Sequence, residues 1–418
     1  MTTVSIITIG DELLIGQVID TNSAWLAQEL NKIGITVTRR VAVGDKYDEI
    51  WNALDQEAAT ANIILITGGL GPTADDITKP LLCKYFNGKM IVNQEALENV
   101  TLLFEKVFKR PLTERNIKQA EVPDTCRVLI NPRGTAAGML FEKENKIFVS
   151  MPGVPHEMKG IMMDHVIPLL KNKFDLPHIA YRTLVTFGIG ESMLADLIQS
   201  FEEALPSHIK LAYLPNYGIV RLRLSAIGKD KDLLEKEIDT LFITLQELAK
   251  DYVVTNEDEP MEKIVAKMLL QRKQNLATAE SCTGGYLAHL ITSIPGSSAF
   301  FQGSMITYSN QVKEHLLQVK KETIEKNGAV SEAVVIEMTQ GILKHLKTTY
   351  AISVSGIMGP DGGTAEKPVG TVWVAVGNLN SIKTHQFHFR FDRQKNIQLT
   401  AMNAFNLLRQ FIIGNDSN

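Results

Sequence analysis

The sequence has few cysteines and no excess of positive charge, and each deficit excludes a class of protein. Only three cysteines occur among 418 residues, and Cys83, Cys126 and Cys282 are far apart in the chain. Three widely spaced cysteines form neither a disulfide framework nor a metal knuckle. The formal net charge of −4 argues against a general nucleic-acid binder, because affinity for a phosphate backbone needs a concentrated basic surface.

The sequence also lacks a long apolar run. No stretch approaches the roughly 20 apolar residues of a membrane span. Residues 1–7 enter a strand-like run without the basic segment of a secretion signal. We therefore expect a cytoplasmic protein with no membrane partner. Composition is that of a globular protein, with 44% hydrophobic and 22% charged residues, and the length predicts two or three domains.

Strand and helix patterns alternate over residues 1–175, as they do in α/β domains. Two apolar strands, at 4–9 and 62–66, each run into a polar cluster. Ligands bind at the carboxyl ends of strands in parallel sheets, so both clusters should lie at one cleft. Turns at 131–138 and 151–158 are placed to close the same cleft.

Glycines and carboxylates dominate these clusters. Glycine N–H groups can approach a phosphate, and carboxylate oxygens can hold a divalent cation. The alternative is that Asp75 or Asp76 caps a helix and that the glycines only turn the chain. The candidate nucleotide-binding residues are Asn22, Gly68, Gly69, Gly71, Thr73, Pro152 and Gly153. The candidate metal ligands are Asp11, Glu12, Asp75 and Asp76.

This first part resembles the molybdopterin-binding fold through residues 67–73, Asp75, Asp76 and the turn 152–155. Together with residues 9–16, the same stretch is similar to the N-terminal half of the CinA family of competence/damage-inducible proteins. The resemblance implies a three-layer α/β domain. It also implies metal-dependent ADP-ribose pyrophosphatase activity, with a divalent metal ion as cofactor, rather than molybdopterin insertion.

Residues 178–250 form a smaller unit with predicted strands at 182–187 and 219–226 and predicted helices at 191–203 and 231–250. Alternation in the second strand is typical of a half-buried sheet. The pattern resembles the KH-like middle domain of the same family.

An RNA-binding KH module needs a Gly-x-x-Gly loop, whereas residues 188–191 are Gly-Ile-Gly-Glu. We therefore expect a spacer or dimerisation role, with Arg221 and Arg223 on a solvated strand face. The acidic, proline-containing stretch 256–260 is the predicted linker.

The stretch 275–286 is the strongest candidate for chemistry. It predicts a strand, a polar turn with two glycines and the start of a helix. Ser281 and Cys282 are candidate nucleophiles on the turn, and the backbone N–H groups of residues 283–285 are candidate donors to an oxyanion. A buried turn with a Ser or Thr cap is the structural alternative.

Three separated motifs make the resemblance of this last domain close. Residues 279–285, the segment 307–313 and the run 359–372 match the C-terminal domain of the CinA family. That family hydrolyses the amide of nicotinamide mononucleotide to nicotinate mononucleotide and ammonia. The resemblance implies a nicotinamide-nucleotide amidase that needs no cofactor and forms a homodimer.

Serine attack on an amide requires a base, and no histidine lies within the three motifs. A lysine serves if burial lowers its pKa. Carried over from the family, Ser281 is the nucleophile, Lys313 the general base and Tyr308 its partner. The substrate-binding candidates are Thr283, Gly284, Gly285, Gly356, Asp361, Gly362, Gly363 and Arg393. A rival mechanism uses the Cys282 thiolate.

Departures from the family pattern occur at Met358, Ala365, Phe391 and Gln398, so affinity or substrate choice is expected to differ. The expected domains are residues 1–175 (molybdopterin-binding-like), 176–255 (KH-like) and 256–418 (amidase). The alternative function is nucleotide sensing or scaffolding with one or both pockets catalytically silent.

Overall fold

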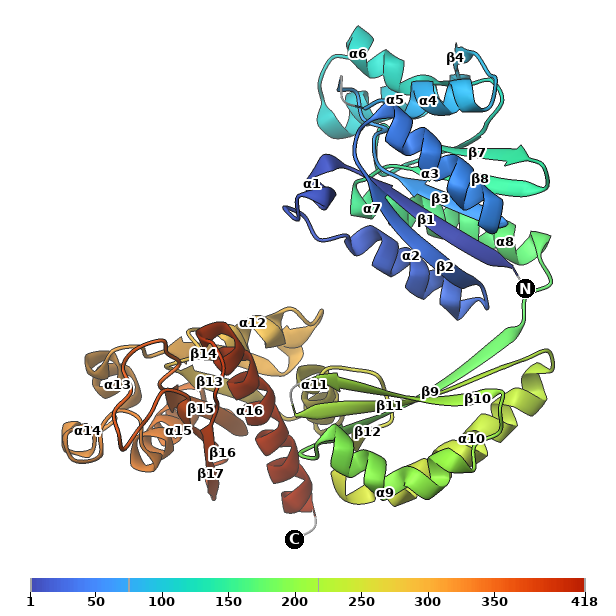
Figure 1. Cartoon of the computed structure of the whole chain (residues 1–418). Coiled ribbons are helices and arrows are strands. Elements are labelled where there is room, and N and C mark those ends of the chain that lie inside the picture. The colour runs from blue at the N-terminus through green and yellow to red at the C-terminus, as the bar shows by residue number, and fades with distance from the viewer. Residues whose placement is uncertain (1, 74–75, 217, 417–418) are drawn as a thin grey trace. The chain divides into compact units, whose positions relative to one another are not determined.

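The computed structural model describes residues 2–73, 76–216 and 218–416 (Figure 1). The chain forms two compact units, each containing segments of the middle region. One unit comprises Met1–Arg182, Ser200–Leu211 and Arg223–Leu245, and the other comprises Thr183–Gln199, Ala212–Leu222 and Gln246–Asn418. Among the described residues, no helix is both long enough and apolar enough to cross a membrane.

The N-terminal part is built on a six-stranded sheet of order β2-β1-β3-β8-β7-β6. Its strands are β1 (Thr3–Ile9), β2 (Thr36–Val43), β3 (Ile63–Thr67), β6 (Arg127–Leu129), β7 (Gly138–Lys143) and β8 (Lys146–Met151). The first four in this spatial order are parallel, and the β8–β7 and β7–β6 pairs are antiparallel. A separate antiparallel pair is formed by β4 (Met90–Val92) and β5 (Glu121–Pro123).

Helices cover both faces of this sheet. The α-helices are α1 (Asp11–Leu14), α2 (Thr21–Lys32), α3 (Tyr47–Thr60), α4 (Thr78–Tyr85), α5 (Gln94–Leu102), α6 (Glu114–Ile117), α7 (Pro155–Ile161) and α8 (Ile167–Lys173). The short helical segments are Leu103–Phe108, Lys118–Ala120 and Met162–Val166. Alternate residues of β1 and β3 enter two cores, one shared with α2, α7 and α8 and the other with α3 and α4. The predicted three-layer α/β fold is confirmed.

The middle region is an α+β module, as predicted. Its elements are β9 (His178–Phe187), α9 (Glu191–Glu203), β10 (Ile209–Asn216), β11 (Ile219–Gly228), α10 (Lys231–Leu248), a short helical turn (Lys250–Tyr252) and β12 (Val253–Thr255). The sheet order is β10-β11-β9-β12. On β11, Arg221 is partly exposed and forms an ion pair with Asp258 at 2.8 Å, so the acidic segment expected to be a linker supplies its partner.

The C-terminal part has a five-stranded sheet of order β14-β13-β15-β16-β17, in which β13 is parallel to β14 and β15. Its strands are β13 (Leu276–Glu280), β14 (Phe301–Ile306), β15 (Tyr350–Gly356), β16 (Thr371–Gly377) and β17 (Ile382–His388). Its helices are α11 (Met261–Arg272), α12 (Tyr286–Thr292), a short turn (Ser297–Ala299), α13 (Asn310–Leu317), α14 (Lys321–Asn327), α15 (Glu332–Leu346) and α16 (Arg393–Asp416).

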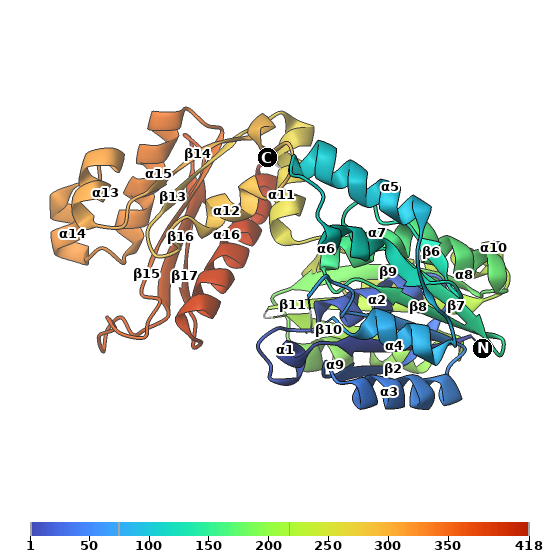
Figure 2. The ribbon, with the colours of Figure 1, turned by 90° about the horizontal axis from the view of Figure 1, so that it is seen from above.

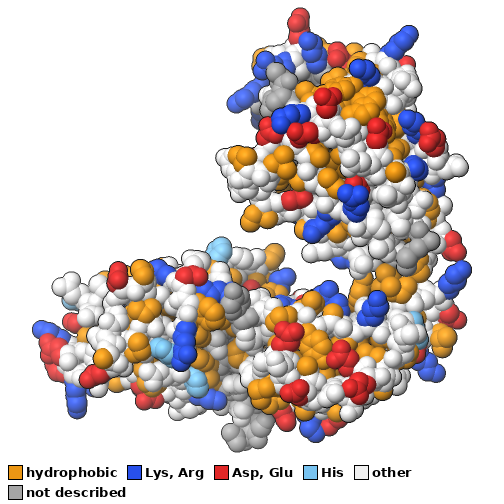
Figure 3. Space-filling view, in the orientation of Figure 1, with side chains coloured by type: hydrophobic (Ala, Val, Ile, Leu, Met, Phe, Trp, Pro, Cys, Tyr) orange, Lys and Arg blue, Asp and Glu red, His pale blue; other side chains and the backbone are white. Residues whose placement is uncertain are grey.

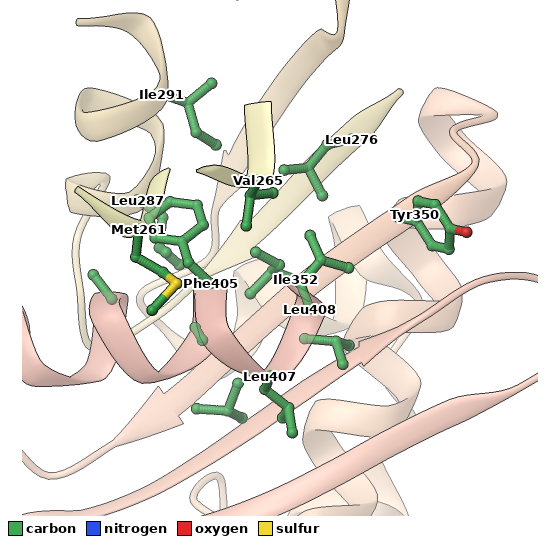
Figure 4. Packing of buried hydrophobic residues seen from close by; sticks show 14 of the residues in the cluster. Met261, Val265, Leu276, Leu287, Ile291, Tyr350, Ile352, Phe405, Leu407 and Leu408 are labelled. Carbon is green, nitrogen blue, oxygen red and sulfur yellow. The ribbon is translucent and has the colours of Figure 1, made fainter. Parts of the chain in front are cut away.

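Figure 2 shows α13, α14 and α15 on one side of this sheet and α11, α12 and α16 on the other. The layer formed by α11, α12 and α16 encloses the larger of the two hydrophobic cores of this part. Figure 4 shows Phe405 and Leu408 of α16 packed near Val265 of α11 and Ile352 of β15, all at most 1% exposed. Burial of several such side chains, each stabilising by about 1.5–3 kcal/mol, fixes the strand ends that carry the polar turns.

Charges are mixed on the face seen in Figure 3, where Lys and Arg alternate with Asp and Glu. The described residues on this face therefore form no continuous basic surface.

Candidate active site

A cavity of about 190 Å³ lies where the parallel strands β13 and β15 end. Ser281 follows β13 directly, and its N–H donates to the carbonyl of Val354 on β15 at 3.1 Å. On the other side, the N–H of Thr307 after β14 donates to the carbonyl of Glu280 at 2.7 Å. Both neighbouring strands therefore hold the turn that carries Ser281. The cavity therefore lies at the edge of the sheet where the carboxyl ends of parallel strands meet, the usual place of a ligand site in such sheets.

Lys313 brings a buried amine to Ser281. Ser309 caps the N-terminus of α13 by accepting from the Val312 N–H, and helix geometry turns the side chain of Lys313 back toward the preceding chain. Its Nζ lies 3.0 Å from Oγ of Ser281 and donates to the carbonyl of Thr307 at 2.8 Å and to that of Tyr308 at 3.3 Å. The side chain is 1% exposed, and this burial lowers its pKa.

These three contacts satisfy the ammonium ion, and they can also be made by the neutral amine that the lowered pKa favours. A neutral amine has two N–H bonds and one lone pair, whereas the ammonium ion has three N–H bonds. In the neutral amine, the carbonyls of Thr307 and Tyr308 take two N–H bonds, which leaves the lone pair for the hydroxyl of Ser281. A lysine held in this way can accept the proton of an attacking serine.

Cys282 lines the same cavity but is 6% exposed. Burial raises the pKa of its thiol to about 12. The thiolate is the reactive form of cysteine, so a thiol with this pKa is a poor nucleophile near neutral pH. Between the two candidates, the contacts therefore favour Ser281.

Tyr308 and Arg393 meet across the mouth of the cavity, which both residues line. Nη2 of Arg393 donates to the phenol oxygen of Tyr308 at 3.2 Å, and Nη1 donates to the carbonyl of Gly359 at 2.8 Å. Tyr308 thus contacts Lys313 through its carbonyl oxygen, whereas its phenol oxygen accepts from Arg393. Both acceptors of Arg393 are uncharged, so its positive charge is available to an anion.

Two of the three predicted oxyanion donors are engaged within the protein. The Gly284 N–H donates to the carbonyl of Ser281 at 3.2 Å, and the Gly285 N–H donates to the carboxylate of Glu280 at 3.0 Å. The N–H of Thr283 is the member of this group that has no such acceptor within the described part of the chain.

The other predicted residues divide into two groups. Gly356, at the end of β15, lines the cavity. Asp361, Gly362 and Gly363 lie on the exposed loop between β15 and β16, outside the cavity wall. Sequence reasoning missed several residues of the wall, and only Asn310 lay within a recognised motif. The missed residues are Asn310, Ala329, Val330 and Ser355.

The four residues that depart from the family pattern also differ in their position relative to the cavity. Met358 is buried, lines the cavity and offers its carbonyl to Asn396 at 3.1 Å. Phe391 and Ala365 are exposed, and Gln398 accepts from Lys395 on the same helix at 3.3 Å. Only Met358 is therefore placed to alter the wall of the cavity.

A second cavity, of about 390 Å³, lies at the carboxyl ends of β1 and β3 in the N-terminal part. Five of the predicted nucleotide-binding residues line it. They are Gly68, Gly69, Gly71, Pro152 and Gly153. A β-carbon at Gly68 would collide with the carbonyl oxygen of Ile9, and Gly68 has a φ of 116°, so close packing requires glycine there.

The other two predicted residues lie nearby. Thr73 donates to the carboxylate of Asp76 from its N–H at 2.9 Å and from its hydroxyl at 2.5 Å. Asn22 lines an adjoining cavity of about 120 Å³ and donates to the carbonyl of Gly153 at 2.7 Å. The Oδ1 atom of Asn22 is buried and accepts no hydrogen bond from the described residues.

Carboxylates surround the larger N-terminal cavity. They belong to Glu12, Asp45, Asp76 and Glu157. Oxygen ligands of this kind suit a divalent cation. Within the described residues, however, no three acidic, histidine or cysteine side chains are close enough together to hold one ion. Of the predicted ligands, Asp11 accepts from the N–H of Asp45 at 3.2 Å, and Asp75 lies outside the described residues.

Three family models match successive parts of the chain. "Probable molybdopterin binding domain" matches residues 5–172, "Damage-inducible protein CinA KH domain" matches 181–255 and "CinA C-terminal domain" matches 258–412. The "CinA-like protein" of Flavobacterium psychrophilum is 45% identical over 414 residues, covering 99% of both chains.

More distant relatives carry related names. The "Putative competence-damage inducible protein" of Halothermothrix orenii is 38% identical and covers 97% of this chain and 98% of its own. A crystal structure of the competence damage-inducible protein A from Klebsiella pneumoniae is 35% identical. It covers 36% of this chain and 96% of that chain, with a TM-score of 0.35.

Proposed function

The chain belongs to the CinA family, and from that premise we propose that its C-terminal cavity hydrolyses the carboxamide of nicotinamide mononucleotide. The products are nicotinate mononucleotide and ammonia. The observation that carries this proposal is the buried Lys313 amine, 3.0 Å from the hydroxyl of Ser281 and oriented by two carbonyls.

In the first half of the reaction, Oγ of Ser281 attacks the carboxamide carbon while Nζ of Lys313 takes the hydroxyl proton. The tetrahedral intermediate carries an oxyanion, toward which the N–H of Thr283 is the available donor among those predicted. Collapse of the intermediate breaks the C–N bond. The nitrogen leaves as ammonia with the proton held by Lys313, and the nicotinoyl group remains on Ser281 as an ester.

In the second half, water attacks the ester carbon and Lys313 accepts the proton of the water. Breakage of the ester bond returns that proton to Oγ of Ser281 and releases the nicotinate carboxylic acid, which ionises in solution. The rate should rise with pH through the pKa of Lys313, because only the neutral amine accepts a proton.

Recognition of the substrate phosphate is assigned to Arg393. The carboxamide and the phosphate lie at opposite ends of the nucleotide, so a carboxamide at Ser281 directs the phosphate away from the β13 turn. Arg393 lines the cavity, and its hydrogen bonds within the described part of the chain go to two uncharged oxygens. A guanidinium forms strong charge-assisted hydrogen bonds with phosphate oxygens.

The test is ammonia release from nicotinamide mononucleotide by the full chain, beside Ser281→Ala and Lys313→Ala. Release by the parent that both substitutions remove would support the proposal. A folded parent that releases no ammonia would exclude this substrate and leave binding without catalysis, the sensing alternative, as the better account.

We further propose that the N-terminal cavity binds a nucleoside diphosphate compound such as ADP-ribose. Its volume of about 390 Å³ and its glycine-lined wall support this proposal. The surrounding carboxylates would repel phosphates without a bound cation, so the activity implied by the family requires a divalent ion. Titration of ADP-ribose with and without Mg²⁺, followed by calorimetry, tests it; equal binding under both conditions would contradict the requirement.

A further inference from the structure

Glu280 is a buried carboxylate that the Ser281–Lys313 reaction does not use. It ends β13, immediately before Ser281, and is 0% exposed. A buried carboxylate destabilises a protein unless hydrogen bonds compensate for its lost hydration. Its partners therefore indicate why this position holds a charge.

Six donors surround the carboxylate, and four of them come from the turn and helix that follow Ser281. Oε2 accepts from the hydroxyl of Thr283 at 2.7 Å, from the N–H of Gly285 at 3.0 Å and from that of Leu287 at 3.1 Å. Oε1 accepts from the N–H of Ala288 at 2.9 Å and, more weakly, from two hydroxyls. Those hydroxyls belong to Thr278 and Ser304, at 3.4 and 3.3 Å.

We propose that Glu280 is a positioning residue, whose carboxylate fixes the turn 281–285 so that Oγ of Ser281 remains within reach of Nζ of Lys313. This inference rests on the proposed function, in which Ser281 is the nucleophile. Gly284 and Gly285 have positive φ values of 60° and 99°. Glycine allows many backbone conformations, so the hydrogen bonds from Thr283 and Gly285 to the Glu280 carboxylate add to those from the neighbouring strands in restraining this turn.

A neutral amide cannot replace this carboxylate. Glutamine has one acceptor oxygen, and its NH₂ group is a donor. In either orientation, the NH₂ group would face at least one backbone N–H, that of Ala288 on one side or those of Gly285 and Leu287 on the other. Two facing donors repel each other, so Glu280→Gln displaces the turn while it preserves side-chain volume.

The experiment measures the rate at which a fluorophosphonate labels Ser281 in the full chain. In this reaction Oγ of Ser281 bonds to phosphorus, fluoride leaves and Lys313 takes the hydroxyl proton. We expect Glu280→Gln to slow labelling by about 10²-fold, as small displacements of a reacting group do. With nicotinamide mononucleotide as substrate, kcat should fall to a similar degree and KM should stay within about twofold, because Glu280 lies behind the cavity wall.

Two further variants keep the test decisive if Glu280→Gln does not fold. Thr283→Val removes one donor on the turn and should slow labelling by about tenfold, the usual effect of a lost hydrogen bond to a charged group. Ser304→Ala is the matched control, because it removes a donor on β14 and leaves the turn bonded. It should label within about twofold of the parent.

Equal labelling of the parent, Glu280→Gln and Thr283→Val, at a temperature where all are folded, would overturn the inference, even if the melting temperature of the variants fell. A parent that is not labelled at Ser281 would overturn it together with the proposed nucleophile. A parent that is labelled but releases no ammonia would exclude the proposed substrate alone, and the labelling rates would still decide the role of Glu280.

Discussion

Lys79 in the N-terminal part and Lys313 in the C-terminal part are both buried lysines with lowered pKa values, but their neighbours differ. Nζ of Lys79 donates to the carbonyl of Gln119 at 2.8 Å, and burial lowers its pKa to about 8. Lys313 meets two carbonyls and the hydroxyl of Ser281. Burial lowers the pKa of either lysine, but the base role requires a hydroxyl facing the lone pair. A lowered pKa by itself therefore identifies no catalytic residue.

The two cavities differ in charge as well. Four carboxylates line the larger N-terminal cavity, whereas the described lining of the C-terminal cavity contains Lys313 and Arg393 and no acidic residue. Under the proposed function, an anionic nucleotide would be attracted directly by the second cavity, whereas the first would need a cation to accept phosphate. We infer that the two halves recognise phosphate by different means.

The largest expected effect contrasts the two lysines directly. Lys313→Met replaces the amine with an apolar side chain of similar length and so removes the base. We therefore expect kcat/KM for nicotinamide mononucleotide to fall by about 10³ to 10⁴-fold. Lys79→Met is the matched variant and should leave that activity within about twofold. Steady-state ammonia release measures both. Equal losses in the two variants would show that the contact with Ser281 is not what distinguishes the lysines.

Arg393→Ala tests the contrast in phosphate recognition. Loss of a charge-assisted hydrogen bond should raise KM for nicotinamide mononucleotide by about 10 to 100-fold. Nicotinamide riboside has no phosphate, so its kcat/KM should change much less in the same variant. Arg393→Lys keeps the charge and should lie between the parent and Arg393→Ala. A similar loss of kcat/KM for both substrates would show that Arg393 does not bind the phosphate.

We expect the lowered pKa of Lys79 to affect the free energy of unfolding of the protein rather than its amidase activity. Its folded-state pKa of about 8 lies below the unfolded value of about 10.4, so the unfolded chain binds more protons between these two values. The free energy of unfolding should therefore rise with pH in this window, by about 3 kcal/mol in total for this residue, and be flat below pH 8. The cost of burying the charged lysine is fully present below pH 8.

Urea unfolding at pH 7 and pH 9.5, followed by tryptophan fluorescence, measures this rise, and Lys79→Met should lack the part due to Lys79. Two tryptophans, Trp25 and Trp51, report on the N-terminal part. An identical pH dependence in parent and variant would mean that Lys79 keeps an ordinary pKa in the folded protein.

The smallest effect concerns Cys282. Cys282→Ala removes a protonated thiol beside Ser281, so turnover should stay within about threefold of the parent while the protein loses a little stability from the smaller side chain. Ammonia release and thermal unfolding measure the two quantities. Loss of all turnover in a folded variant would favour the thiol as the nucleophile and contradict the Ser281–Lys313 contrast.

The sequence alone determined the fold of each part and the turns that carry the chemistry. Apolar runs such as those at 4–9 and 350–354 are local signals, and the strands β1 (Thr3–Ile9) and β15 (Tyr350–Gly356) lie where they predicted. Ser281 and Lys313 could be named because each belongs to a short motif. Their separation of 32 residues along the sequence does not indicate how far apart the two side chains lie in space.

Only the tertiary structure decided which side chains meet. The strand order β14-β13-β15 places the ends of three strands side by side, and this order brings Lys313 to Ser281 and Arg393 to Tyr308. The structure also shows that the Gly285 N–H, which was predicted to stabilise the oxyanion, donates to the Glu280 carboxylate instead. Asp361, a predicted substrate-binding residue, lies on an exposed loop. Secondary structure follows from neighbouring residues, whereas a site depends on contacts between distant segments, which no local pattern in one sequence records.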